Sequence, residues 1–132
     1  MPSTSQPAHS RPSILVVEDD ADARSLLLFF LELEGWRVDT AADGQEAIYR
    51  LGRSVPDVML LDLSMPRMDG WTVLARIAVE PAWQTMPVVV MSADHRQRTV
   101  VSEFGVNEFL AKPFTMDRLR STLRRILEDP GR

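Results

Sequence analysis

Short runs of consecutive apolar residues constrain this chain more than any other feature of its sequence. They lie at residues 13–17 (SILVV), 58–61 (VMLL) and 87–91 (PVVVM), and each has the length of a strand rather than of a helix. None of them alternates regularly between apolar and polar residues, so both sides of each strand must be covered. A parallel sheet with helices on both faces provides this environment. The runs therefore predict the buried strands of an α/β fold.

Two further strands and five helices are predicted around these runs. Residues 36–40 show the alternation of a strand, and residues 108–110 form a short one. Apolar residues recur at helical spacing in the intervening segments, as with Leu26, Phe30 and Leu33. The predicted helices cover residues 22–34, 43–53, 70–80, 96–104 and 115–127.

The ends of several predicted helices carry local signals. Gly35 follows the first helix, where a C-terminal glycine is common. Asp43 and Glu46 form a capping-box-like start, and Thr115 is placed to cap the last helix. Five successive strand-and-helix units with right-handed crossovers predict a doubly wound α/β sandwich with a five-stranded parallel sheet.

The length of 132 residues fits one domain, which we place at residues 13–128. Residues 1–12 contain three of the nine prolines together with several Ser and Thr residues, a composition that predicts a disordered N-terminal tail. Residues 129–132 are expected to be a short C-terminal tail.

Composition argues against several classes of function. The net charge is -4 and the basic residues are scattered, which disfavours direct binding to nucleic acid. The longest apolar run, residues 26–31, is far too short to span a bilayer, and residues 1–12 lack the apolar segment of a signal peptide. Cysteine is absent, so disulfides are excluded. We expect a cytoplasmic protein without a direct nucleic-acid or membrane partner.

Polar residues follow the predicted strands at the point where each ends. Glu18 and Asp19 follow the first strand, Asp62 the third and Ser92 the fourth, while Lys112 comes just after the fifth. The carboxyl ends of parallel strands meet at one edge of the sheet, where ligands bind. Three carboxylates there would repel one another without a cation, and hard oxygen ligands suit Mg²⁺. A nucleophilic carboxylate, a divalent metal and a positioned lysine are the parts that in-line phosphoryl transfer needs.

Four segments carry a family resemblance. They are ILVVEDD (14–20), LLDLSMPRMDG (60–70), VVVMSA (88–93) and FLAKPF (109–114). In this order, and at these strand ends, they resemble the receiver domain family of two-component signalling. The resemblance extends over residues 13–128 and implies a flavodoxin-like (βα)5 sandwich.

The resemblance assigns the acidic positions. Asp62 matches the phosphoacceptor, Asp19 a direct Mg²⁺ ligand, and Glu18 an acid that acts through a metal-bound water. Ser64 matches the position whose backbone carbonyl completes the metal site. The side chains of Ser64 and Asp94 match two positions that tune the lifetime of the phosphoryl group.

The resemblance also assigns a switch. Ser92 matches the hydroxyl that turns toward the phosphoryl group, and Phe109 the aromatic ring that follows it inward. Lys112 matches the lysine that pairs with a phosphoryl oxygen, and the bond from Lys112 to Pro113 matches one that is cis in the family.

These matches imply a phosphoacceptor signalling switch rather than an enzyme, with self-catalysed phosphotransfer and slow autodephosphorylation. The donor would be a histidine kinase or a histidine phosphotransfer protein. Phosphorylation would alter the surface formed by the fourth helix, fifth strand and last helix. A downstream protein, or an output domain outside this sequence, would read that change, and a homodimer through the same surface is compatible with the resemblance.

Other readings of the same residues are open to test. A constitutive interaction module of the same fold would lack phosphate turnover, but every essential position is filled. A hydrolase of the haloacid dehalogenase type needs a second acid two residues after its nucleophile, where Ser64 stands. Dinucleotide binding lacks its glycine-rich fingerprint after the first strand. Taken singly, Asp19 or Asp20 could be a helix cap, Ser92 a turn residue and Lys112 a surface lysine.

Overall fold

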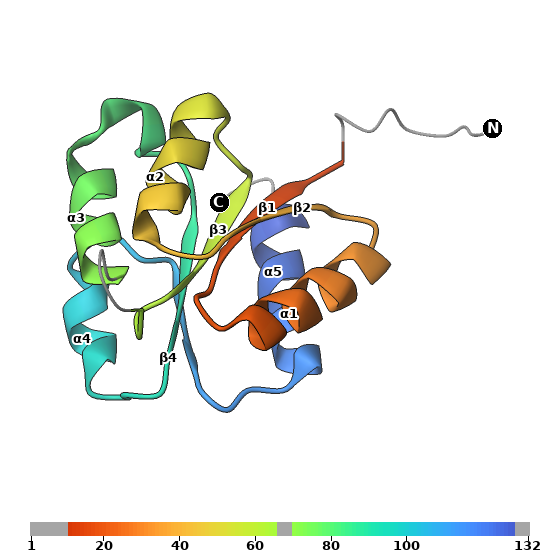
Figure 1. Ribbon diagram of the computed structural model, residues 1–132. Coiled ribbons are helices and arrows are strands. Elements are labelled where there is room, and N and C mark those ends of the chain that lie inside the picture. The colour runs from red at the N-terminus through yellow and green to blue at the C-terminus, as the bar shows by residue number, and fades with distance from the viewer. Residues whose placement is uncertain (1–10, 66–69, 129–132) are drawn as a thin grey trace.

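The computed structural model describes residues 11–65 and 70–128, and these form five strands and five α-helices (Figure 1). The strands are β1 (Ser13–Val17), β2 (Arg37–Ala41), β3 (Val58–Asp62), β4 (Val88–Ser92) and β5 (Glu108–Ala111). They form one parallel sheet in the order β2-β1-β3-β4-β5. The predicted five-stranded, doubly wound architecture is confirmed.

Helices cover both faces of this sheet (Figure 1). They are α1 (Ala21–Leu33), α2 (Gly44–Arg53), α3 (Gly70–Val79), α4 (Gln97–Ser102) and α5 (Met116–Glu128), with a short 3-10 turn at Pro81–Trp83. Helices α1 and α5 pack on one face, and α2, α3 and α4 pack on the other. None of the helices in residues 11–65 and 70–128 is long and apolar enough to cross a membrane.

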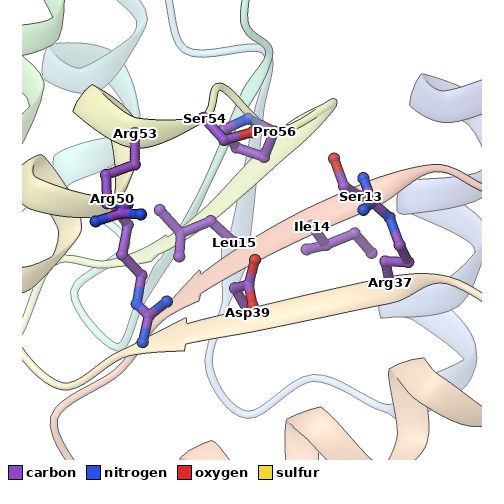
Figure 2. A pocket seen from close by; sticks show the side chains of 9 residues that line it. All are labelled: Ser13, Ile14, Leu15, Arg37, Asp39, Arg50, Arg53, Ser54 and Pro56. Carbon is purple, nitrogen blue, oxygen red and sulfur yellow. The ribbon is translucent and has the colours of Figure 1, made fainter. Parts of the chain in front are cut away.

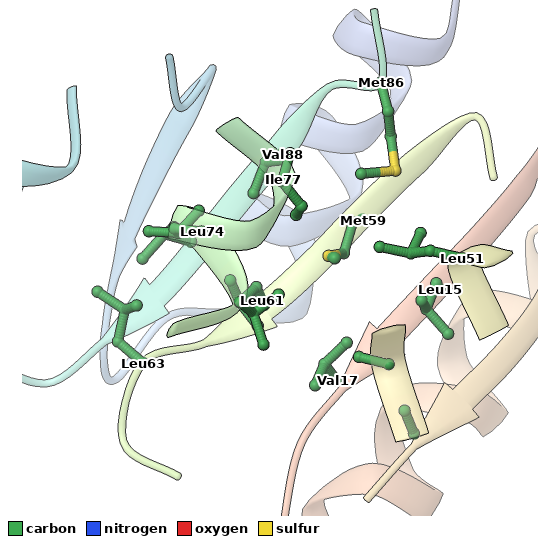
Figure 3. Close-up of a cluster of buried hydrophobic side chains, with 14 of the residues drawn as sticks. Leu15, Val17, Leu51, Met59, Leu61, Leu63, Leu74, Ile77, Met86 and Val88 are labelled. Carbon is green, nitrogen blue, oxygen red and sulfur yellow. The ribbon is translucent and has the colours of Figure 1, made fainter. Parts of the chain in front are cut away.

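Each face of the sheet has its own apolar core, because successive residues of a strand point to opposite sides. Leu15 and Val17 of β1 join the core under α2 and α3, while Ile14 and Val16 join the core under α1 and α5. Figure 3 shows the first of these cores. All residues of β3 and β4 are buried, as their uniform apolar sequences predicted. Full burial of each such side chain contributes about 1.5 to 3 kcal/mol relative to exposure.

The predicted caps are present in the structure. The Asp43 carboxylate accepts a hydrogen bond from the Glu46 backbone N–H at 2.8 Å, and Glu46 Oε1 accepts one from Ala42 at 2.8 Å. Thr115 Oγ1 accepts from the N–H of Arg118 at 3.0 Å, at the start of α5. Each satisfies a backbone donor that the first turn of a helix leaves unpaired.

Helix α1 differs from its predicted limits and orientation. It begins at Ala21, because the Asp20 side chain caps its first turn. Leu27 and Leu31 face the sheet, whereas the side chains of Leu26 and Leu33 are 51% and 66% exposed. The segment LLLFFLEL is apolar around most of the helix, so its periodicity could not select the buried face. Helix α4 is also shorter than the predicted 96–104.

Candidate functional site

Three carboxylates lie together at the carboxyl end of the sheet. Glu18, Asp19 and Asp62 each offer an oxygen, and these oxygens lie within 4.8 Å of one another. Glu18 is 4% exposed and Asp62 1% exposed, while Asp19 is exposed. They meet because β1 and β3 are paired neighbours that end at the same edge of the sheet. The predicted convergence of these acids is therefore present.

The loop after β1 is held by contacts that fix the acids in place. Glu18 Oε2 accepts a hydrogen bond from the Asp20 N–H at 3.2 Å. Arg24, in the first turns of α1, donates from Nη1 to the backbone carbonyls of Glu18 at 2.9 Å and Asp19 at 3.3 Å. Arg24 was not among the residues predicted to take part in the site. A cation near a helix N-terminus runs against the helix dipole, and this could have indicated a specific partner.

Lys112 places a side-chain ammonium against two of the carboxylates of this cluster. Its Nζ lies 3.3 Å from Asp62 Oδ2 and 3.8 Å from Glu18 Oε1. The backbone N–H of Lys112 donates to the Ser92 carbonyl at 2.8 Å, which fixes the end of β5 against β4. The bond between Lys112 and Pro113 is cis, as the resemblance implied.

The charge balance of the cluster is incomplete. Burial, and after it the neighbouring Asp62 carboxylate, raise the pKa of Glu18 from an ordinary value of 4.5 to about 7. The Asp20 N–H and the Lys112 ammonium act in the opposite direction but do not offset these effects. Three carboxylates face one ammonium, so a compensating cation would favour the ionised form of Glu18.

The donor set fits Mg²⁺. Its side-chain oxygens are hard ligands, two of them are buried, and the cluster remains negative beside Lys112. The Ser64 N–H donates to Asp62 Oδ1 at 3.0 Å and so orients the Asp62 carboxylate. The role predicted for the Ser64 backbone carbonyl stays a prediction.

The two predicted switch residues are both buried. Ser92 is 1% exposed at the end of β4, and Phe109 is 4% exposed in β5. The Ser92 hydroxyl donates to Gln97 Oε1 at 2.5 Å and accepts from the Asp94 N–H at 3.0 Å. Sequence reasoning did not find Gln97, because only the path of the β4–α4 loop brings its amide to Ser92.

Asp94, predicted to tune the phosphoryl lifetime, is held by a local ion pair. Its two oxygens accept hydrogen bonds from Arg96 Nε at 2.9 Å and Nη2 at 3.0 Å. These bonds lower the pKa of Asp94, so its carboxylate stays charged. The tuning role itself remains a prediction.

An apolar groove of about 430 Å³ begins at the acidic cluster. Glu18 and Lys112 form its polar end. Leu26 and Leu27 of α1 line one wall, and the residues that follow the cis bond line the other. A partner lying in this groove would therefore contact the site and helix α1 together.

A second hollow, of about 200 Å³, lies at the opposite end of the sheet between β1, β2 and the end of α2 (Figure 2). Arg37, Arg50 and Arg53 line it together with Asp39. Arg50 is already paired with Glu46 at 3.2 Å, and Arg53 donates to the Tyr49 hydroxyl at 3.0 Å. Its charged side chains are mostly exposed, so this hollow does not resemble the buried acidic cluster.

A five-stranded parallel sheet with buried acids and a lysine at its carboxyl edge defines a receiver-type signalling domain. Residues 14–124 match the family described as the response regulator receiver domain, and the chain belongs to this family. It is therefore a receiver domain of the kind found in two-component response regulators.

Relatives and solved structures agree with this assignment. A 14.6 kDa protein of Leptolyngbya boryana is 39% identical over 102 residues, which cover 76% of this chain and 78% of that protein. The transcriptional regulatory protein PrrA of Mycobacterium leprae is 36% identical, over 92% of this chain and 52% of PrrA. The chain spans about half the length of such transcriptional regulators.

Among solved structures, chemotaxis protein CheY4 of Vibrio cholerae superposes with a TM-score of 0.83 at 27% identity, over 89% of this chain and all of CheY4. Response regulator TrrA of Thermotoga maritima, solved with Mg²⁺ and BeF, gives a TM-score of 0.79 at 29% identity, over 88% of this chain and 99% of TrrA.

Proposed function

We propose that Asp62 accepts a phosphoryl group from a phosphohistidine of a histidine kinase or a histidine phosphotransfer protein. The observation that carries this proposal is the buried Asp62 carboxylate with Lys112 Nζ at 3.3 Å, inside a cluster of three acids. A purely structural role would not explain why two acids are buried with only one ammonium, because uncompensated buried charge is destabilising.

The residues of the chain have distinct parts in this transfer. The Ser64 N–H orients Asp62 through Oδ1, and Lys112 faces Oδ2. An Asp62 oxygen forms the new O–P bond as the N–P bond of the donor breaks, and the electron pair returns to the imidazole nitrogen. Lys112 then pairs with a phosphoryl oxygen.

Glu18, Asp19, Asp62 and the Ser64 carbonyl would hold Mg²⁺. When bound, the ion would neutralise negative charge that gathers on the phosphoryl oxygens. The carboxylates of the chain make this binding favourable, because their mutual repulsion falls when a cation is present. Slow hydrolysis of the acyl phosphate by the same groups would return the chain to its resting state.

The output of the switch would be a change in surface. We infer that Ser92 turns toward the phosphoryl group and that Phe109 follows it, which alters the face formed by α4, β5 and α5. A downstream protein, an output domain outside this sequence or a second copy of the chain would read this face. Residues 13–128 would form the complete receiver unit, acting in the cytoplasm.

The groove beside the cluster supports a protein as the natural phosphodonor. It joins Glu18 and Lys112 to Leu26, which is 51% exposed on α1. A helical partner packed on this apolar surface would bring a phosphohistidine to the carboxyl edge of the sheet.

The proposal is tested by intact mass measurement after incubation with Mg²⁺ and acetyl phosphate. We expect wild type to gain one labile phosphoryl group and Asp62→Asn to gain none. Asp57→Asn is the matched control, because Asp57 pairs with Ser13 at the other end of the same strands and should not affect transfer. An unmodified wild type that also fails to bind Mg²⁺ would favour the constitutive interaction module.

A further inference from the structure

The hydroxyl proton of Ser92 already has an acceptor in the structure. The hydroxyl donates this proton to Gln97 Oε1 at 2.5 Å and accepts a hydrogen bond from the Asp94 N–H at 3.0 Å. Ser92 is also 1% exposed, so no bulk water competes for these positions. The hydroxyl is therefore held on the α4 side of the strand end.

A serine hydroxyl has only one proton to donate. While that proton bonds to Gln97, the hydroxyl cannot also donate it to a phosphoryl oxygen on Asp62. The two hydrogen bonds are mutually exclusive. The carboxamide of Gln97 thus competes directly with the phosphoryl group for the switch residue.

Gln97 also links the start of helix α4 to the sheet, next to the hydrogen bond that Asp94 Oδ1 accepts from the Arg96 N–H at 3.0 Å. Helix α4 spans six residues and has no side-chain hydrogen bond at its N-cap, Arg96. Such a short helix is unstable without tertiary contacts. Gln97 ties its first residue to β4, and the guanidinium of Arg98 lies 4.7 Å from the centre of the Phe109 ring in β5.

We propose that Gln97 is a positioning residue that holds the Ser92 hydroxyl in its resting place and so sets the threshold of the phosphorylation switch. This inference rests on the function proposed above. When a phosphoryl oxygen accepts the hydrogen bond of the Ser92 hydroxyl, Gln97 loses its partner and the first turn of α4 loses a tether to β4. Arg98 follows Gln97 in α4 and contacts the Phe109 ring of β5, so loss of this tether would alter the surface formed by α4 and β5.

The test is calorimetric titration with beryllium fluoride in the presence of Mg²⁺, using the full chain. This anion stands for the phosphoryl group on Asp62. Removing the competing acceptor in Gln97→Ala should tighten binding about fivefold, the factor that corresponds to one neutral hydrogen bond. Gln97→Met, which keeps the length of the side chain without its acceptor, should do the same.

Two further variants separate positioning from general effects on the helix. Thr99→Ala, an exposed change on α4, should leave the affinity unchanged. In a Ser92→Ala background, Gln97→Ala should change the affinity less than about 1.5-fold, because the competed proton is gone. The inference is overturned if Gln97→Ala and Gln97→Met leave the affinity as in wild type, or if they shift it equally without Ser92.

Failure of the function proposed above has a different signature. If wild type itself shows no beryllium fluoride binding with Mg²⁺, then the phosphoacceptor assignment fails and the role of Gln97 fails with it. If wild type binds beryllium fluoride and the Gln97 variants bind it with the same affinity, the phosphoacceptor assignment stands and only the positioning role of Gln97 is rejected.

Discussion

The charged residues at the two ends of the sheet differ in burial and in pairing. At the carboxyl end, Glu18 and Asp62 are buried with a single lysine, and the pKa of Glu18 rises to about 7. At the amino end, Asp57 accepts hydrogen bonds from the backbone N–H and the hydroxyl of Ser13 near the surface. The same strands β1 and β3 thus begin in locally satisfied contacts and end in unsatisfied ones. Uncompensated burial is what distinguishes a site from a stable surface.

The largest contrast between the two ends is expected when a cation is removed. Lys112→Met should slow phosphorylation by acetyl phosphate about 100-fold, because a preorganised charge aimed at the transferring group is lost. Arg50→Met, which removes a cation paired with Glu46 on α2, should leave the rate unchanged. Single-turnover rates measured by mass spectrometry test both variants, and equal rates for all three proteins would remove the contrast.

The pH dependence of the unfolding free energy should reveal the cost of burying the Glu18 carboxylate at the carboxyl end of the sheet. Glu18 has a pKa of about 7 in the folded chain and an ordinary value of 4.5. The folded state therefore binds more protons between these values, so the unfolding free energy falls as pH rises from 4.5 to 7. This difference in pKa corresponds to a loss of at most about 3 kcal/mol in the unfolding free energy, because each pKa unit corresponds to about 1.4 kcal/mol.

Urea unfolding at pH 5 and pH 8 in the presence of EDTA measures this loss. Glu18→Gln should flatten the dependence, and Mg²⁺ should restore stability at pH 8 in wild type only. A slope that persists unchanged in Glu18→Gln would assign the effect to another group.

Two glycines offer a matched test of packing at the two ends. A Cβ added to Gly70 would lie 2.6 Å from Leu63 Cδ2 and 2.8 Å from the Asp62 carbonyl oxygen. Gly70→Ala should therefore destabilise the chain by about 1 to 3 kcal/mol and displace the end of β3. Thermal unfolding measures the loss, and a variant as stable as wild type would show that the backbone yields there.

At the amino end the same change should act in the opposite direction. A Cβ at Gly52, in the last turn of α2, would meet nothing within 4 Å. Gly52→Ala should stabilise the chain by about 0.5 to 1 kcal/mol through helix propensity. A lower melting temperature for this variant would indicate a hidden constraint in α2.

The smallest effect is expected from the exposed ion pair on α2. Glu46 and Arg50 lie 3.2 Å apart with side chains about 40% exposed. Arg50→Ala should cost only about 0.3 to 0.5 kcal/mol, and 1 M NaCl should remove most of that difference. A salt-independent loss of several kcal/mol would show that this exposed pair behaves like the buried charges of the site.

The site residues that follow directly from the order of the strands could be predicted from the sequence. Contacts that depend on the path of a loop or on the rotation of a helix could not. Asp62 and Lys112 were predictable, because polar residues directly after apolar runs must meet at one edge. Gln97 and Arg24 were not, since their contacts depend on how a loop or first turn is placed. The rotation of α1 was equally hidden by its nearly continuous apolar sequence. Three predicted segments lie outside the described residues: most of the N-terminal tail, residues 129–132, and residues 66–69 of the segment LLDLSMPRMDG (60–70).

The two outer strands bear on how the molecule behaves in a crowded solution. A sheet open at both sides offers unpaired backbone groups that can recruit another sheet and begin aggregation. Strand β2 places exposed Arg37 and Asp39 along its side, and β5 has only four residues, with Glu108 paired to Arg125 at 2.8 Å. Charged side chains on β2 and the short length of β5 both disfavour the edge-to-edge strand pairing from which fibrils grow.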